Sequence, residues 1–129
     1  MTDAGYSGKP LIAKLGYQPG DNILVQNMPD WFGQYLEDEG ILSTSTLPAT
    51  WAHMFVNEQK DLRQLAETFD LTQVEKGLWI SWPKRASKIP TDISEQDLRD
   101  VILPLGWVDV KVVAVDDNWS GLKFLRRKT

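Results

Sequence analysis

The sequence has no cysteine and only one histidine. The lack of cysteine excludes disulfides, thiolate zinc sites, iron–sulfur clusters and cysteine nucleophiles. The single histidine, His53, excludes metal sites that need several histidines. Because His53 lies in an apolar segment, we expect a hydrogen-bonded residue of the core, with ligand or general-base duty as the alternative. We therefore expect neither a metal nor a cofactor.

Long hydrophobic runs are also absent, and no membrane-spanning segment is expected. The first residues, Met1 to Gly5, carry an acid and no apolar stretch, a pattern that does not indicate export. We therefore expect a cytoplasmic protein. The net charge of -4 argues against general nucleic-acid binding, which requires many phosphate contacts. The basic end, residues 126–128, is expected to be solvated.

The chain has 129 residues, of which 42% are hydrophobic and 25% charged. That length and composition are typical of one globular domain with its own core, so we assign residues 1–129 to a single domain. Within it, residues 1–8 are expected to be flexible or to fold back on the domain. No internal repeat and no low-complexity segment is evident.

Short apolar runs alternate with segments of helical periodicity. Runs at 22–26, 51–56 and 78–82 are typical of buried strands, and a shorter strand is expected at 41–43. Helices are expected from 9 to 16, after Pro29, after Asn57 as the capping residue, and after Ser94. Ser94 and Asp97 have the spacing of a capping box. This order predicts a parallel sheet covered on both faces.

The C-terminal part departs from this alternation. β-rich runs at 108–115 and 122–126 are joined only by a turn at 116–121, so they must pair antiparallel. The prediction is an α/β fold, a three-layer Rossmann-like sandwich whose mostly parallel sheet ends in a C-terminal antiparallel hairpin. This layout resembles a trimmed class I methyltransferase fold, in which the last two strands also form an antiparallel hairpin.

Ligands of such folds bind beyond the carboxyl ends of the strands. A dinucleotide or S-adenosylmethionine site needs a glycine-rich turn after the first strand and an acid after the second. The first turn reads Gln26-Asn27-Met28-Pro29-Asp30, and the second strand ends in Ser43-Thr44-Ser45. Neither half of the fingerprint is present, so the layout does not by itself imply methyltransferase chemistry.

The loop 83–92 carries three cations and leads into the helix that starts at Ser94. A helix N-terminus beside cations favours an anionic group, whereas the alternative is a solvated loop. A folded-back N-terminal segment would bring Ser7 and Lys9 to the same edge, although Ser7 is alternatively a helix cap. Trp119 either packs on the core or lines a pocket mouth. The predicted ligand-binding set is Ser7, Lys9, Lys84, Arg85, Lys88, Thr91 and Trp119.

Three stretches, at 5–11, 82–92 and 108–123, carry a family resemblance: Gly-Tyr-Ser-Gly-Lys-Pro-Leu, Trp-Pro-Lys-Arg-Ala-Ser-Lys-Ile-Pro-Thr-Asp, and Val-Asp-Val-Lys-Val-Val-Ala-Val-Asp-Asp-Asn-Trp-Ser-Gly-Leu-Lys. In this order they are similar to a family of small uncharacterised bacterial proteins grouped under a domain of unknown function. The resemblance implies a bacterial, stand-alone, single-domain protein. It brings no activity, cofactor or catalytic residue.

Three functions remain open at this point. The leading one is a non-catalytic or regulatory module that binds a small anionic ligand or a protein partner at the carboxyl edge. The second is a diverged methyltransferase-like or phosphate-handling enzyme with Asp116 or Asp117 as base, although these two residues are first of all typical turn formers. The third is a subunit of a larger assembly that uses Trp31 and Trp119 as exposed anchors. Each leaves the oligomeric state open.

Overall fold

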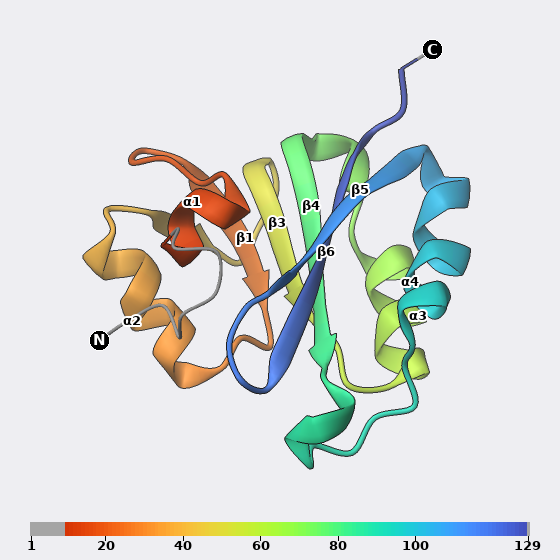
Figure 1. Cartoon of the computed structure of the whole chain (residues 1–129). Coiled ribbons are helices and arrows are strands. Elements are labelled where there is room, and N and C mark those ends of the chain that lie inside the picture. Colours follow the sequence, from red (N-terminus) through yellow and green to blue (C-terminus); the bar gives the residue numbers. More distant parts are fainter. Residues whose placement is uncertain (1–9, 129) are drawn as a thin grey trace.

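The computed structural model describes residues 10–128, which form a six-stranded sheet between two layers of helices (Figure 1). The strand order is β2-β1-β3-β4-β6-β5. β1 to β4 run parallel, and β6 is antiparallel to both of its neighbours. The strands are β1 (Asn22–Gln26), β2 (Leu42–Thr44), β3 (Ala49–Phe55), β4 (Val74–Pro83), β5 (Trp107–Ala114) and β6 (Trp119–Arg126). The predicted fold class is confirmed.

The helices are divided between the two faces of the sheet. α1 (Leu11–Leu15) and α2 (Asp30–Asp38) cover one face, and α3 (Gln59–Thr68) and α4 (Glu95–Ile102) cover the other (Figure 1). Short 3-10 helices connect the larger elements at η1 (Leu71–Gln73), η2 (Arg85–Ser87) and η3 (Leu103–Leu105). In the part of the chain that the structure describes, no helix is long and apolar enough to span a bilayer.

Each face of the sheet has its own hydrophobic core. Ala52 and Met54 of β3 point toward α3 and α4, whereas Trp51, His53 and Phe55 belong to the core under α1 and α2. This division follows from the pleat, because successive side chains of a strand point to opposite faces. It also explains why the strand is apolar along its whole length rather than in alternation.

The ends of α3 and α4 are capped in different ways. Ser94 and Asp97 form the predicted capping box, in which each side chain accepts a backbone N–H of the other residue. The predicted cap of α3, Asn57, is wrong, because Glu58 stands at the capping position, and its side chain makes no capping hydrogen bond. The carboxylate of Asp92, from the loop before α4, accepts the N–H of Gln59 at 2.8 Å instead. A distant loop therefore closes the start of α3.

The connection from β2 to β3 differs from the expected alternation. Parallel strands normally need a dozen or more residues to return, usually including a helix. Here residues 45–48 make the whole link, and Leu47 packs against the core under α3 and α4. The link thus crosses the sheet on that face without a helix. This arrangement leaves the carboxyl end of β1 without a helix of its own on the α3 side.

β4 is longer than the sequence predicted and begins at Val74 rather than Leu78. Gly77 therefore lies inside the strand. This position requires glycine, because a Cβ would come within 2.6 Å of the Trp51 ring. The hairpin of β5 and β6 lies at one edge of the sheet as predicted, with β6 paired to β4 and β5 outermost. Trp119, predicted in the turn, is the first residue of β6.

Candidate functional site

The strand order reverses between β1 and β3. From β1 the chain goes outward to β2 on one side, and it then returns to β3 on the other side. In open α/β sheets, the crevice beyond the carboxyl ends of two such strands is the usual ligand site. These ends lie at the lower edge of the sheet in Figure 1, where β1, β3 and β4 point. The side chains around these ends are therefore the first candidates for a binding site.

A cavity of about 180 Å³ opens at this point, between the ends of β1 and β3 and the helix α3. We call it the switch-point cavity. It is smaller than the roughly 300–1,000 Å³ of a pocket that holds a drug-sized molecule. Its lining residues are Gln26, Asn27, Met54, Phe55, Val56, Asp61, Gln64, Leu65, Thr68 and Phe69. The cavity thus suits a ligand of few atoms.

The polar lining comes from two elements that fold separately. Gln26 is the last residue of β1, and its register partner Met54 lies beside it on the same face of the sheet. Asp61, Gln64 and Thr68 project from α3, and their helical spacing places them next to the buried Leu65. None of these polar side chains has a hydrogen bond or ion pair with another residue in the range 10–128. Their donors and acceptors are therefore available to a ligand.

The turn after β1 is tight although it contains no glycine. Asn27 has a φ of 57°, in the left-handed region that asparagine tolerates better than most residues. The glycine-rich turn sought in the sequence is thus replaced by one asparagine whose side chain remains at the cavity wall. Sequence reasoning missed this residue because it searched for glycine alone.

The basic loop lies at the same edge of the sheet but beside different strands. The N–H of Lys84 donates to the carbonyl of Asn118 at 2.8 Å, and Pro83 pairs with Trp119. The loop therefore follows the ends of β4 and β6, and its 3-10 helix projects below the sheet (Figure 1). Arg85 and Lys88 are exposed, and Lys88 has a φ of 65°. Ser7 and Lys9 lie outside the described residues.

The far end of the basic loop docks on α3. The Thr91 hydroxyl donates to the Asn57 carbonyl at 2.6 Å and accepts the N–H of Ile93. Together with the Asp92 cap, these bonds make the loop end part of the scaffold. The start of α4, where the sequence offered a place for an anion, is filled by the capping box of Ser94. The structure thus brings Lys84 and Trp119 together and separates Thr91 from them along the loop.

Trp119 packs on the core, with 8% of its surface exposed and its ring centroid 5.1 Å from that of Phe55. Its predicted use as an exposed anchor is therefore wrong, whereas Trp31 is 38% exposed. Asp116 forms the expected turn, because its carboxylate accepts the N–H groups of Asn118 and Trp119. Residues 126–128 are exposed, as expected of a solvated end, although Arg126 also donates to the carbonyl of Val74 at 2.7 Å.

His53 is the expected core histidine. Its Nδ1 shares a hydrogen bond with the Tyr17 hydroxyl at 2.9 Å, and its Nε2 shares one with the Ser81 hydroxyl at 2.7 Å. Burial lowers the pKa of His53 to about 3, so the ring is neutral. Burial also raises the pKa of Tyr17 well above its usual value, and Asp21 contributes to that rise. These groups are enclosed and cannot meet a ligand without opening the fold.

Among residues 10–128, no group of histidines and carboxylates could hold a metal ion. Two functional candidates were missed on α3, Asp61 and Gln64, although a signal existed. They lie on the helix next to the predicted apolar stripe, where a polar side chain faces the edge of a core. Gln26 gave a similar signal, because it is a polar residue at the end of an apolar run. Its side chain lies on the same face of the sheet as that of Met54.

No family model matches the chain, and no curated protein matches it. Among solved structures, it is similar to magnesium protoporphyrin IX methyltransferase from Synechocystis PCC 6803 with bound SAM, at 11% identity and a TM-score of 0.53, over 90% of this chain and 74% of that one. It is also similar to a protein of the NADB-Rossmann superfamily from Streptococcus agalactiae, at 11% identity and a TM-score of 0.52, over 99% of this chain and 61% of that one.

The chain thus spans less than two thirds of the Streptococcus agalactiae protein. At these identities the likeness shows the fold alone. The resemblance to a family of small bacterial proteins stays a prediction. The strand order and these structural neighbours show that the chain has a Rossmann-like, methyltransferase-like α/β fold.

Proposed function

We propose that the protein is a non-catalytic module that binds a small ligand at the carboxyl edge of its sheet, in the switch-point cavity. One observation carries the proposal. Polar side chains from β1 and α3 surround a cavity at the reversal of strand order, and they have no partner within residues 10–128. A concave place where a few polar side chains converge is the usual position of a small-ligand site.

The chemistry of the lining favours binding over catalysis. Asp61 is the one ionisable side chain among the lining residues, so no second titratable group stands beside it to share a proton transfer. The buried histidine is engaged by Tyr17 and Ser81 and lies on the other face of the sheet. A lone carboxylate with amides around it is typical of recognition rather than of acid–base work.

A diverged methyltransferase-like enzyme is the alternative, and the fold favours it. Against it stand a first turn without glycine and a second strand that ends at Thr44 without an acid. The short link between β2 and β3 also provides no helix around the place where a nucleoside would need walls. Binding of an S-adenosyl compound with release of a methylated product would support this alternative over the non-catalytic one.

A second binding place, for an anion or an acidic protein partner, is proposed at the exposed cations Arg85 and Lys88. A lysine in the left-handed region is uncommon, and such strain is found preferentially at functional positions. Lys84 adds a third cation at the start of the same loop. The contributions of Ser7 and Lys9 remain part of this second proposal.

The first proposal is tested by a thermal-shift screen of small alcohols, amines, sugars, nucleosides and S-adenosyl compounds. Thr68→Trp places an indole at the cavity, and Glu67→Trp is its matched control on an exposed position that does not line the cavity. We expect a ligand that raises the Tm of the wild type and of Glu67→Trp but not of Thr68→Trp. Equal shifts in all three proteins would contradict the proposed site.

The second proposal is tested with inorganic phosphate on the double variant Arg85→Gln/Lys88→Gln. Arg63→Gln is the control, because Arg63 is an exposed cation that belongs to α3 and not to the loop 83–92. A phosphate-dependent rise in Tm that disappears only in the double variant supports an anion site. A rise that survives in the double variant excludes the loop as its source.

A further inference from the structure

The charge of the switch-point cavity is one-sided. Asp61 is its one charged lining residue, and Gln26, Asn27 and Gln64 contribute neutral amides. Neither lysine nor arginine lines it. An anionic ligand would therefore face a carboxylate without a compensating cation, which is costly in a site partly shielded from water.

The helix N-terminus nearest the cavity, that of α3, is already occupied by the protein's own groups. A helix N-terminus attracts anionic groups, and α3 begins at the cavity side of the sheet edge. Its first N–H group, on Gln59, donates to the carboxylate of Asp92 at 2.8 Å. The side-chain amide of Gln59 donates to the Asp92 carbonyl at 3.0 Å and to the Asp97 carboxylate at 3.4 Å. The protein's own carboxylates thus occupy the approach to this helix.

The floor of the cavity is apolar. Met54 of β3 and Leu65 of α3 are buried core residues, and Phe69 adds an aromatic wall at the end of the helix. A volume of about 180 Å³ is close to that of a cavity that accepts a single benzene ring. The site therefore combines a small apolar space with a carboxylate and amide oxygens at its rim.

From this arrangement, and resting on the proposed function, we infer that the ligand is a small organic amine or guanidine. Its apolar body lies on Met54, Leu65 and Phe69, and its cationic head faces Asp61 and the amide oxygens of Gln26 and Gln64. A cation supplies N–H donors to acceptors that are all on the protein side, and its charge-assisted bond to a carboxylate is stronger than a neutral one.

Three probes of similar shape separate charge from fit: benzylamine, benzyl alcohol and benzoate. Binding of each to the whole protein is measured by isothermal titration calorimetry near pH 7, where the amine is protonated. We expect benzylamine to bind about tenfold more tightly than benzyl alcohol, and benzoate to bind the weakest. The preference for benzylamine is expected to shrink as salt is added, because a partly exposed charge pair is screened.

Asp61→Asn keeps the shape of the side chain and removes its charge, and Glu67→Gln is the control on the same helix outside the cavity. We expect Asp61→Asn to weaken benzylamine about tenfold and to leave benzyl alcohol within about twofold. Circular dichroism of both variants is the check that they remain folded.

The outcomes distinguish the ligand class from the site. If the three probes bind equally well and Thr68→Trp blocks all of them, the cavity is a site but the inference of a cation is overturned. If benzoate binds best, the inference is overturned in the same way. If Thr68→Trp changes the binding of none of the probes, the proposed function fails together with the inference.

Discussion

The two faces of the sheet carry polar side chains in opposite situations. Under α1 and α2, Tyr17, His53 and Ser81 are buried, and each is hydrogen-bonded to its neighbour. At the carboxyl edge under α3, Gln26 and Gln64 line a cavity and have no partner within residues 10–128. The first set completes itself and fixes the fold. The second set is open to solvent and makes no such bonds, and for this reason we propose the cavity rather than the histidine as the binding site.

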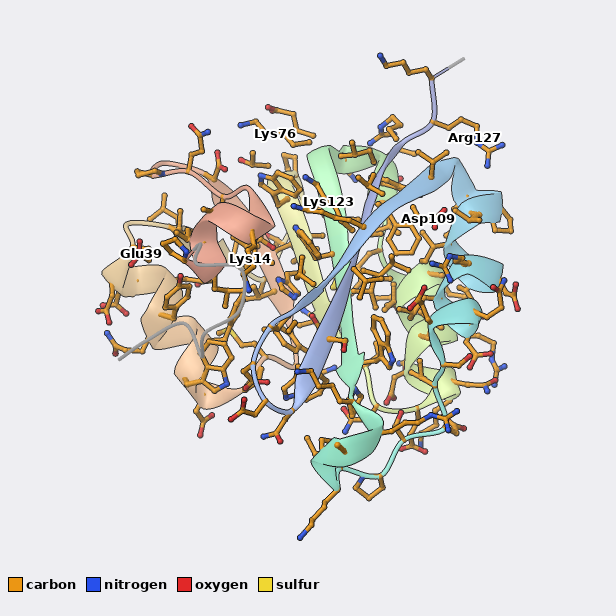
Figure 2. The ribbon with its side chains drawn as sticks, in the orientation of Figure 1. Lys14, Glu39, Lys76, Asp109, Lys123 and Arg127 are labelled. Atoms are coloured by element: carbon orange, nitrogen blue, oxygen red, sulfur yellow. The ribbon has the colours of Figure 1, made fainter. Side chains whose placement is uncertain are left out.

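Charged side chains on both faces of the sheet also have defined contacts. Lys123 lies over the sheet on the α1 side, whereas Asp109 belongs to the α4 side (Figure 2). The Lys123 ammonium is 5.2 Å from the centroid of the Trp51 ring. The pKa of Lys123 is lowered mainly by burial and to a smaller extent by the positive charge of Lys111. Asp109 accepts a hydrogen bond from Arg99 at 2.8 Å. Both faces therefore hold charges in defined contacts, whereas the polar side chains of the cavity make no hydrogen bond or ion pair with another residue of 10–128.

Replacing His53, the middle residue of the buried hydrogen-bonded row Tyr17–His53–Ser81, should have the largest effect on stability. His53→Leu leaves the Tyr17 and Ser81 hydroxyls buried without their partner, and we expect a loss of about 4 kcal/mol in the free energy of unfolding. The measurement is urea unfolding followed by tryptophan fluorescence. The triple variant Tyr17→Phe/His53→Leu/Ser81→Ala removes the stranded hydroxyls and should recover much of this loss. A triple variant less stable than His53→Leu would show that the cost is one of packing alone.

The pH dependence of stability comes next in size. The pKa of His53 falls from 6.5 to about 3 on folding. At a pH between these two values the unfolded chain is therefore protonated at His53 and the folded chain is not. The stability contribution of this group is complete above about pH 6.5 and decreases by about 1.4 kcal/mol per pH unit below it. His53→Gln keeps a donor and an acceptor but does not titrate. The stability difference between wild type and His53→Gln should shrink by about 2 kcal/mol on going to about pH 5. A constant difference would contradict the neutral buried ring.

The loop end that caps α3 should have a smaller effect. Asp92→Ala removes the acceptor of the Gln59 N–H and should lower the free energy of unfolding by about 1 kcal/mol. Asp92→Asn retains an acceptor oxygen and should lose less than half of that amount. Chemical unfolding of both variants provides the measurement. An equal loss in the two variants would mean that the charge at the helix start, and not the hydrogen bond, is what stabilises α3.

The cavity side chains should matter least to stability and most to binding. Gln64→Ala removes an exposed side chain that makes no hydrogen bond or ion pair within the described residues, so we expect its free energy of unfolding to change by less than about 0.5 kcal/mol. Its affinity for benzylamine should nevertheless fall, because an amide oxygen of the rim is lost. A marked loss of stability without a change in affinity would place Gln64 with the structural set and break the contrast between the two faces.

The sequence predicted the parts of the fold that local patterns determine. The capping box of Ser94, the strand that contains His53 and the terminal hairpin all follow from spacing within a few residues. The place of β6 inside the sheet does not, because it depends on how the hairpin pairs with β4. The same holds for Arg126, whose partners lie at Leu71 to Val74, more than fifty positions earlier along the chain.

For the candidate site, the sequence predicted only the edge of the sheet at which it lies. The sequence directed attention to the carboxyl ends of the strands, and the cavity is there. It favoured the basic loop because charge is visible in a sequence, whereas the cavity depends on how β1, β3 and α3 pack together. Thr91 shows the same limitation, since its hydroxyl serves the Asn57 carbonyl, a contact between distant positions.

The most direct test follows the side-chain amide signals of Gln26, Asn27 and Gln64 in ¹H–¹⁵N spectra of the labelled protein during titration with benzylamine. If the switch-point cavity is the binding site, these signals move together and saturate at one dissociation constant, while the backbone signals of Arg85 and Lys88 stay in place. Unchanged amide signals together with shifts confined to the basic loop would contradict the account.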